Sequence, residues 1–111
     1  MQGSGIGRET ALAFANAGAA KVVLAGRKKK NLEVTAENLS RVGSSVETHS
    51  ADISSEDDMR GLAAAVSKWD ILVLCAAYVT TPGPIVEASA KDWWQVFEVR
   101  LFRFCWSFRA K

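Results

Sequence analysis

The chain has 111 residues, of which 49% are hydrophobic and 23% are charged, and its formal net charge is +2. This composition is that of one small globular domain and excludes a disordered chain. The near balance of 14 basic and 12 acidic residues also excludes a protein that coats polyanions in general. The longest uncharged apolar run, residues 71–79, is too short to cross a bilayer, and the first residues lack the apolar stretch of a signal peptide.

The cysteine content indicates the cellular compartment in which the protein is found. Cys75 and Cys105 each lie in an apolar run, and His49 is the only histidine. Two cysteines are too few for a disulfide-rich secreted scaffold, and no spacing indicates a zinc site. We therefore expect buried, reduced thiols in a cytoplasmic protein.

The first half of the chain alternates helix and strand signals. A glycine-rich turn leads into a helix that ends near Gly18, which suits the left-handed residue after a helix. The β-branched run 21–25 predicts a buried strand, 31–41 a second helix and 46–50 a second strand.

The second half continues the alternation. Ser55 and Asp58 have the spacing of a capping box, which predicts a helix that begins there and runs to about residue 68. The apolar run 70–75 predicts a fully buried strand, 80–84 a loop, and the region from about residue 88 a long aromatic helix.

Helices and strands that alternate at this spacing predict an α/β fold, a Rossmann-like doubly wound parallel sheet in one domain over residues 1–111. In such folds the glycine turn follows a strand, and no strand precedes it here. We therefore expect an incomplete sheet.

The N-terminal turn has the features of a phosphate-binding loop. It consists of Gly3, Ser4, Gly5, Ile6 and Gly7. Glycines allow the backbone to approach a pyrophosphate, and the following helix offers unpaired N–H groups at the positive end of its dipole. Gly7 would let the helix pack closely on the sheet. The motif alone is also compatible with a simple flexible turn.

The end of the first predicted strand indicates which dinucleotide would bind. Dinucleotide-binding folds place an acid near this position to bind the ribose 2′-hydroxyl. Here Gly26 stands 19 residues after Gly7 and is followed by Arg27 and three lysines. A guanidinium without a neighbouring carboxylate suits a 2′-phosphate, so the pattern favours NADP over NAD. A solvated helix start is the alternative interpretation.

These motifs together resemble the first half of the short-chain dehydrogenase/reductase family. The resemblance covers essentially the whole chain and rests on five ordered segments: Gly5-Ile6-Gly7-Arg8, residues 22–27, Ala51-Asp52-Ile53, residues 70–73 and residues 92–99. It implies hydride transfer between NADP and a carbonyl or alcohol in the intact family. It further implies that Asp52 contacts the adenine through its side chain and Ile53 through its backbone.

The resemblance also has departures. Met1 stands where the family's phosphate motif has its first glycine. The family's Asn-Asn-Ala-Gly beside the nicotinamide ribose falls on residues 74–77, where only Ala76 is kept and Ala77 adds a methyl group. The family's catalytic Asn falls on Arg100, and its Ser and Tyr-x-x-x-Lys fall beyond residue 111. Tyr78, the only tyrosine, is followed four residues later by Pro82. We therefore assign no catalytic residue and expect an inactive fragment, cut at both ends.

The resemblance also implies which partners to expect. We expect NADP(H), a small-molecule substrate only in a completed protein, and a possible homo-oligomer through the helix at 91–111, which carries an aromatic stripe and packs in dimers of the family. A non-catalytic nucleotide-binding or dimerisation module is the main alternative. A basic RNA-binding fragment is more remote, because no aromatic platform accompanies residues 27–30. We expect neither nucleic acid nor membrane as a partner.

The family's strand order predicts a defect in the sheet. In the order 3-2-1-4, the absent first strand would lie between the strands at 21–25 and 70–75 and would leave both inner edges unpaired. The two strands must then pair directly, borrow a strand, or stay loosely packed, and we expect loose packing for the isolated chain.

Overall fold

The computed structural model describes residues 5–109, with side chains described for residues 5–99. The order of elements is α1 (Ile6–Asn16), β1 (Lys21–Gly26), α2 (Lys29–Val42), β2 (Ser45–Ser50), α3 (Glu56–Ala65), the short 3₁₀ helix η1 (Ile85–Glu87) and α4 (Ala90–Arg109). The predicted helices and the first two strands are confirmed, with bounds that differ by at most three residues.

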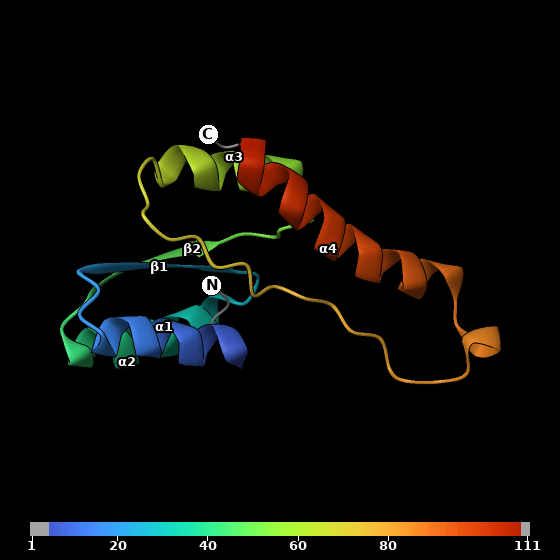
Figure 1. Cartoon of the computed structure of the whole chain (residues 1–111), viewed down its shortest axis with the longest axis horizontal. Coiled ribbons are helices and arrows are strands. Elements are labelled where there is room, and N and C mark those ends of the chain that lie inside the picture. The colour runs from blue at the N-terminus through green and yellow to red at the C-terminus, as the bar shows by residue number, and fades with distance from the viewer. Residues whose placement is uncertain (1–4, 110–111) are drawn as a thin grey trace.

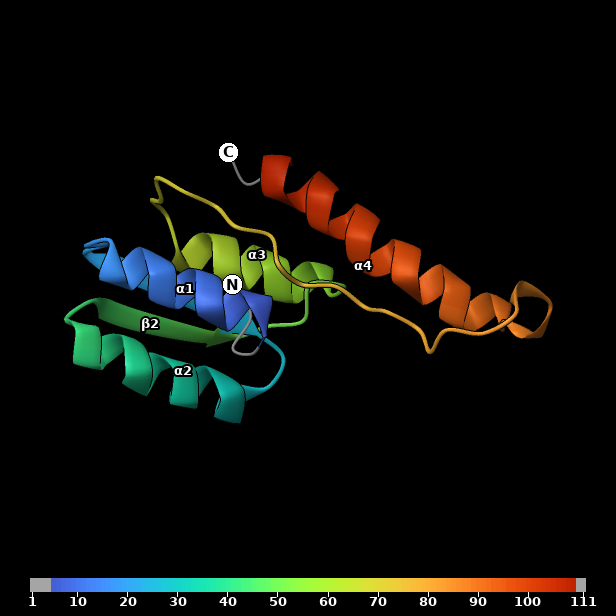
Figure 2. The same ribbon diagram turned by 60° about the horizontal axis from the view of Figure 1, so that its bottom comes forward.

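The sheet has two parallel strands. In the register, Lys21 lies opposite Ser45 and Gly26 lies opposite Ser50. Helices α1 and α2 cover one face, whereas α3 lies over the other (Figure 1). The view in Figure 2 brings the α1–α2 face forward. Helices on both faces of a parallel sheet confirm the predicted α/β fold class, with an incomplete sheet.

The packed core lies between the sheet and the α1–α2 layer. Its buried side chains come from three elements: Ala11 and Ala15 of α1, Val22 and Leu24 of β1, and Leu32 and Leu39 of α2. The alanines of α1 allow that helix to approach the sheet closely. Gly18 has a φ of 94° after the end of α1, as predicted.

The opposite side of the molecule is much less packed. Helix α3 begins as predicted, with the hydroxyl oxygen of Ser55 accepting a hydrogen bond from the N–H of Asp58 at 3.3 Å. However, no residue of α3 is buried, and Ile71 remains 63% exposed. A local cap is therefore enough to start the helix, although little apolar surface is buried beneath it.

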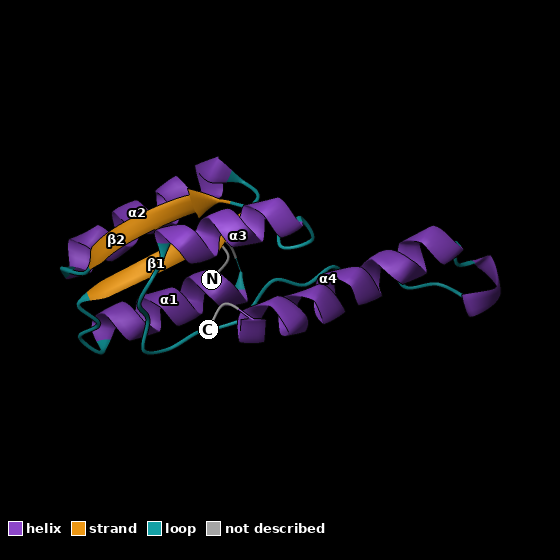
Figure 3. Ribbon diagram, turned by 90° about the horizontal axis from the view of Figure 1, so that it is seen from above, coloured by secondary structure: helices purple, strands orange, loops and turns teal. Residues whose placement is uncertain are grey.

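The prediction of a strand at residues 70–75 is wrong. The segment is irregular, and among the described residues no backbone hydrogen bond joins it to β1 or to another element. Figure 3 shows it passing along the side of β1 that β2 leaves open. An extended segment becomes a strand only when a neighbouring backbone lies at about 4.8 Å, and a groove separates this segment from β1.

Within the described residues, no helix is long and apolar enough to span a membrane.

Candidate functional site

The N-terminus of α1 presents backbone donors without a side-chain cap. Gly5 occupies the N-cap with φ 60° and ψ −137°, a positive-φ conformation that favours glycine. Because glycine has no Cβ, no side chain shields the N–H groups at the start of the helix. Gly7 is buried, as a closely packed helix start requires, whereas Ile6 is 79% exposed. Gly3 and Ser4 lie outside the described residues.

The carboxyl ends of the two strands are tied together beside this helix. The N–H of Ala51 donates to the carbonyl oxygen of Gly26 at 3.0 Å, which extends the sheet pairing one step beyond β2. Arg27 follows Gly26 directly and is exposed. No ion pair joins Arg27 to a carboxylate within residues 5–99. Its guanidinium is thus available to an external anion.

Asp52 is held in a compact turn next to this cation. Its Oδ1 accepts hydrogen bonds from the Ser54 hydroxyl at 2.7 Å and from the Ser54 N–H at 2.9 Å. Its own N–H donates to Asp58 Oδ2 at 2.8 Å. The Ser54 hydrogen bonds lower the pKa of Asp52 from its ordinary value of 3.8, burial opposes them with a smaller effect, and the charge of Arg27 adds the smallest contribution, a further lowering. Asp52 is therefore a carboxylate at neutral pH.

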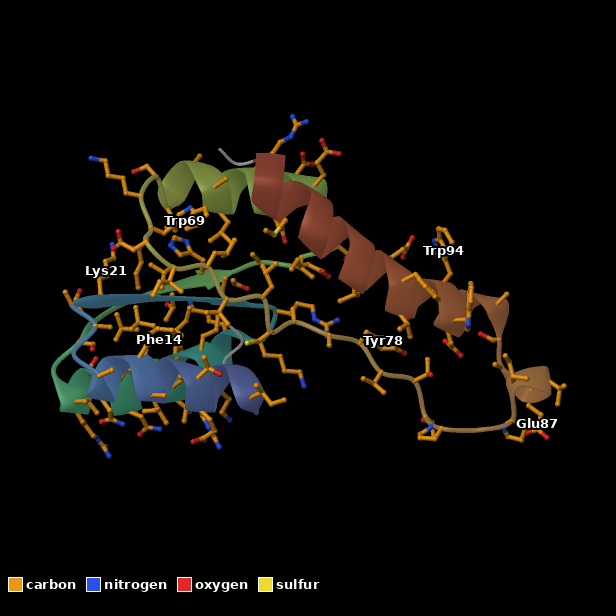
Figure 4. The ribbon with its side chains drawn as sticks, in the orientation of Figure 1. Phe14, Lys21, Trp69, Tyr78, Glu87 and Trp94 are labelled. Atoms are coloured by element: carbon orange, nitrogen blue, oxygen red, sulfur yellow. The ribbon has the colours of Figure 1, made fainter. Side chains whose placement is uncertain are left out.

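A groove of about 910 Å³ opens along the free side of β1. Near the carboxyl end of β1, the groove is lined by five of the residues selected from the sequence: Arg27, Asp52, Ile53, Ala76 and Ala77. The glycine turn does not line the groove within the described residues. Figure 4 shows the extended segment running from Trp69, on the side of β1 away from Phe14, across the molecule to Tyr78.

The sequence interpretation missed Ser54. Its two hydrogen bonds orient the Asp52 carboxylate, and the Asp-x-Ser spacing of an Asx turn is a signal that could have found it. Arg100 belongs to α4, but its side chain lies outside what the structure describes. Cys75, which we expected to be buried, is only partly buried and lines the groove.

Comparison with known proteins identifies the family. The model of the short chain dehydrogenase family matches residues 2–110. The chain belongs to the short-chain dehydrogenase/reductase family. The resemblance of the sequence motifs to this family is thereby confirmed.

Curated relatives are longer than this chain. The short chain dehydrogenase/reductase astE of Aspergillus oryzae is 34% identical over 103 residues, which are 89% of this chain and 40% of that protein. The chain therefore spans about two fifths of the length of this relative.

Solved structures show the same fold and two different cofactors. A metagenomic short-chain oxidoreductase in complex with NADP has a TM-score of 0.87 at 27% identity, with 97% of this chain and 50% of that chain covered. An NAD⁺-bound xylitol dehydrogenase has a TM-score of 0.90 at 23% identity, with 97% of this chain and 43% of that chain covered. The second likeness concerns the fold alone.

Proposed function

We propose that this chain is the NADP(H)-binding portion of a short-chain dehydrogenase/reductase, and that without further residues it does not transfer hydride. The observation that carries the proposal is Arg27, an exposed cation directly after a strand that ends in Gly26 instead of an acid. A guanidinium suits a phosphate through paired, charge-assisted hydrogen bonds.

The residues present fit such a cofactor. The uncapped start of α1 at Gly5 suits a pyrophosphate, and Arg27 suits a 2′-phosphate. Asp52 and Ile53, at the carboxyl end of β2, lie on the same groove and would hold the adenine. Ala76 and Ala77 leave room beside the ribose of the nicotinamide. When bound, the nicotinamide supplies the hydride donor or acceptor; these residues only bind and orient it.

The expected inactivity rests on the residues of the chain itself. Proton transfer to a carbonyl oxygen requires an acid of suitable pKa within hydrogen-bond reach. The only tyrosine, Tyr78, has Pro82 at the position where the family's Tyr-x-x-x-Lys spacing needs a lysine. We expect no NADP-dependent turnover of ketones or alcohols; steady turnover above a protein-free control would contradict this.

Calorimetric titration with two small ligands tests the cofactor preference. Adenosine 2′,5′-bisphosphate and adenosine 5′-monophosphate differ only by the 2′-phosphate. We expect the bisphosphate to bind more tightly, and Arg27→Ala to weaken it by about tenfold or more while leaving the monophosphate unchanged.

Arg41→Ala is the matched control, because Arg41 is an equally exposed arginine in the last turn of α2, away from the strand carboxyl ends. Equal affinities for the two ligands would contradict NADP preference. No binding of either ligand would contradict the nucleotide-binding proposal as a whole.

Two finer expectations accompany this function: pairing of two copies through α4, and a cytoplasmic location. Exposed aromatic side chains at the start of α4, Trp93 at 52% and Trp94 at 56%, support the first. Sedimentation equilibrium of the chain and of a Trp93→Ser variant would test it, with a weaker dimer expected for the variant.

A further inference from the structure

The turn between β2 and α3 holds the Asp52 carboxylate in one orientation. Its Oδ1 accepts two hydrogen bonds from Ser54, one from the hydroxyl at 2.7 Å and one from the N–H at 2.9 Å. Two donors on a single oxygen fix both the rotation of the carboxylate and the oxygen that it presents outward. Ser54 is exposed, so its hydroxyl acts on Asp52 and not on the packing of a core.

The backbone of Asp52 is fixed from the side of α3. The N–H of Asp52 donates to Asp58 Oδ2 at 2.8 Å, and its carbonyl oxygen accepts from the N–H of Ser55 at 3.0 Å. The N–H of Asp58 in turn donates to the Ser55 hydroxyl oxygen that caps α3. The turn is therefore held by its own hydrogen bonds at both ends.

Two polar groups of this turn are left to bind a ligand. Within residues 5–99, no hydrogen bond or ion pair reaches Oδ2 of Asp52 or the N–H of Ile53. The pKa of Asp52, lowered first of all by the Ser54 hydrogen bonds, keeps this carboxylate ionised at neutral pH, so Oδ2 can only accept. One acceptor and one donor therefore stand on consecutive residues.

An acceptor beside a donor matches one edge of a 6-aminopurine. Such a base offers its 6-amino donor next to the N1 acceptor, whereas a 6-oxopurine offers an acceptor next to an N1–H donor. A 6-oxopurine would set acceptor against acceptor and donor against donor. Polar groups that lose water without gaining a partner oppose binding, so the two bases should be distinguished.

We propose that Ser54 is a positioning residue for base recognition: by occupying Oδ1 of Asp52, it directs Oδ2 toward the purine and makes the chain select a 6-aminopurine over a 6-oxopurine. Without the hydroxyl the carboxylate can rotate, and the ligand must then order it at a cost in free energy. The inference rests on the proposed nucleotide-binding function, in which Asp52 and Ile53 hold the base. It adds a residue that acts through Asp52.

Calorimetric titration of the full chain with two ligands that differ only in the base tests the inference. Adenosine 2′,5′-bisphosphate and inosine 2′,5′-bisphosphate carry the same ribose and phosphates. We expect the unchanged chain to bind the adenosine ligand at least about tenfold more tightly. Ser54→Ala should reduce this ratio by about threefold or more, by weakening the adenosine ligand alone, and Ser54→Thr, which keeps a hydroxyl, should retain it.

The ratio of the two affinities separates positioning from a general effect on structure. A loss of stability weakens both ligands equally and leaves their ratio unchanged. Ser50→Ala is the matched control, because Ser50 is an exposed serine at the end of β2, two residues before Asp52. This substitution should leave both affinities unchanged.

Three results would overturn the inference. Equal affinities of the unchanged chain for the two ligands, with clear binding of both, would refute base selection while the nucleotide-binding proposal stands. An unchanged ratio in the Ser54→Ala variant would show that Ser54 has no part in that selection. Binding of neither ligand would refute the proposed nucleotide-binding function itself, and this inference with it.

Discussion

The two faces of the sheet differ in how their helices are held. Helices α1 and α2 bury Ala11, Ala15, Leu32 and Leu39 against the sheet, whereas α3, on the other face, has no fully buried residue. All three helices have recognisable local signals in the sequence. The difference teaches that local signals start a helix, but only a complete neighbouring layer gives its apolar face something to pack against.

The largest expected effect separates the two faces directly. Leu24 is fully buried in the α1–α2 core, whereas Leu72, in the groove wall, is 47% exposed. Leu24→Ala should cost about 2–5 kcal/mol, because it leaves a cavity in a packed core. Leu72→Ala should cost well under half as much, since its side chain already contacts water.

The protection of the α2 backbone amides against hydrogen exchange measures how much each of the two substitutions destabilises the packed core. The Leu24 variant should lose most of the protection in α2, and the Leu72 variant should keep it. Comparable losses from the two substitutions would mean that the groove side is packed as firmly as the core.

A smaller effect concerns α3, which depends on its cap. Ser55→Ala removes the acceptor for the Asp58 N–H and should cost α3 about 1 kcal/mol. Because α3 buries no residue, this loss should fray α3 alone. Carbon chemical shifts along the chain are the measurement: shifts in α3 should move toward coil values while those in α2 stay fixed. A simultaneous change in α2 would show that the two faces are coupled.

The smallest effect concerns the titration of Asp52. Its folded pKa is lowered, so the stability it contributes is present above its ordinary value of 3.8 and is lost as the pH falls through the folded pKa. Ser54→Ala removes the leading cause, so the Asp52 carboxyl signal in an NMR titration should move toward 3.8. Ser54→Thr keeps a hydroxyl and should titrate as the unchanged chain does. An unchanged titration in the alanine variant would assign the shift to other groups.

Sequence patterns predicted the fold where the determinants are local. The β-branched run ending at Ala25, the left-handed Gly18 and the Ser55 cap each report their conformation through nearby residues. Residues 70–75 carry an equally strong strand pattern, yet a strand also needs a partner backbone, which no local pattern supplies. That non-local requirement explains why this one element was predicted wrongly.

The candidate site divides in the same way. Arg27, Asp52 and Ala76 could be selected from position along the chain, because the carboxyl ends of parallel strands meet at one edge. The turn in which Ser54 orients Asp52 depends on the backbone geometry between β2 and α3. The groove depends on the space that remains between β1 and the segment 70–75. Neither follows from the order of residue types alone.

The central claim is that β1 pairs on one edge and is open on the other. Residue-resolved amide exchange of the chain without any ligand tests this most directly. We predict an alternation along β1: slow exchange at Val22, Leu24 and Gly26, which bond to β2, and fast exchange at Lys21, Val23 and Ala25, which face the groove. Uniform protection of all six amides would show that the second edge is already paired, and would contradict the account.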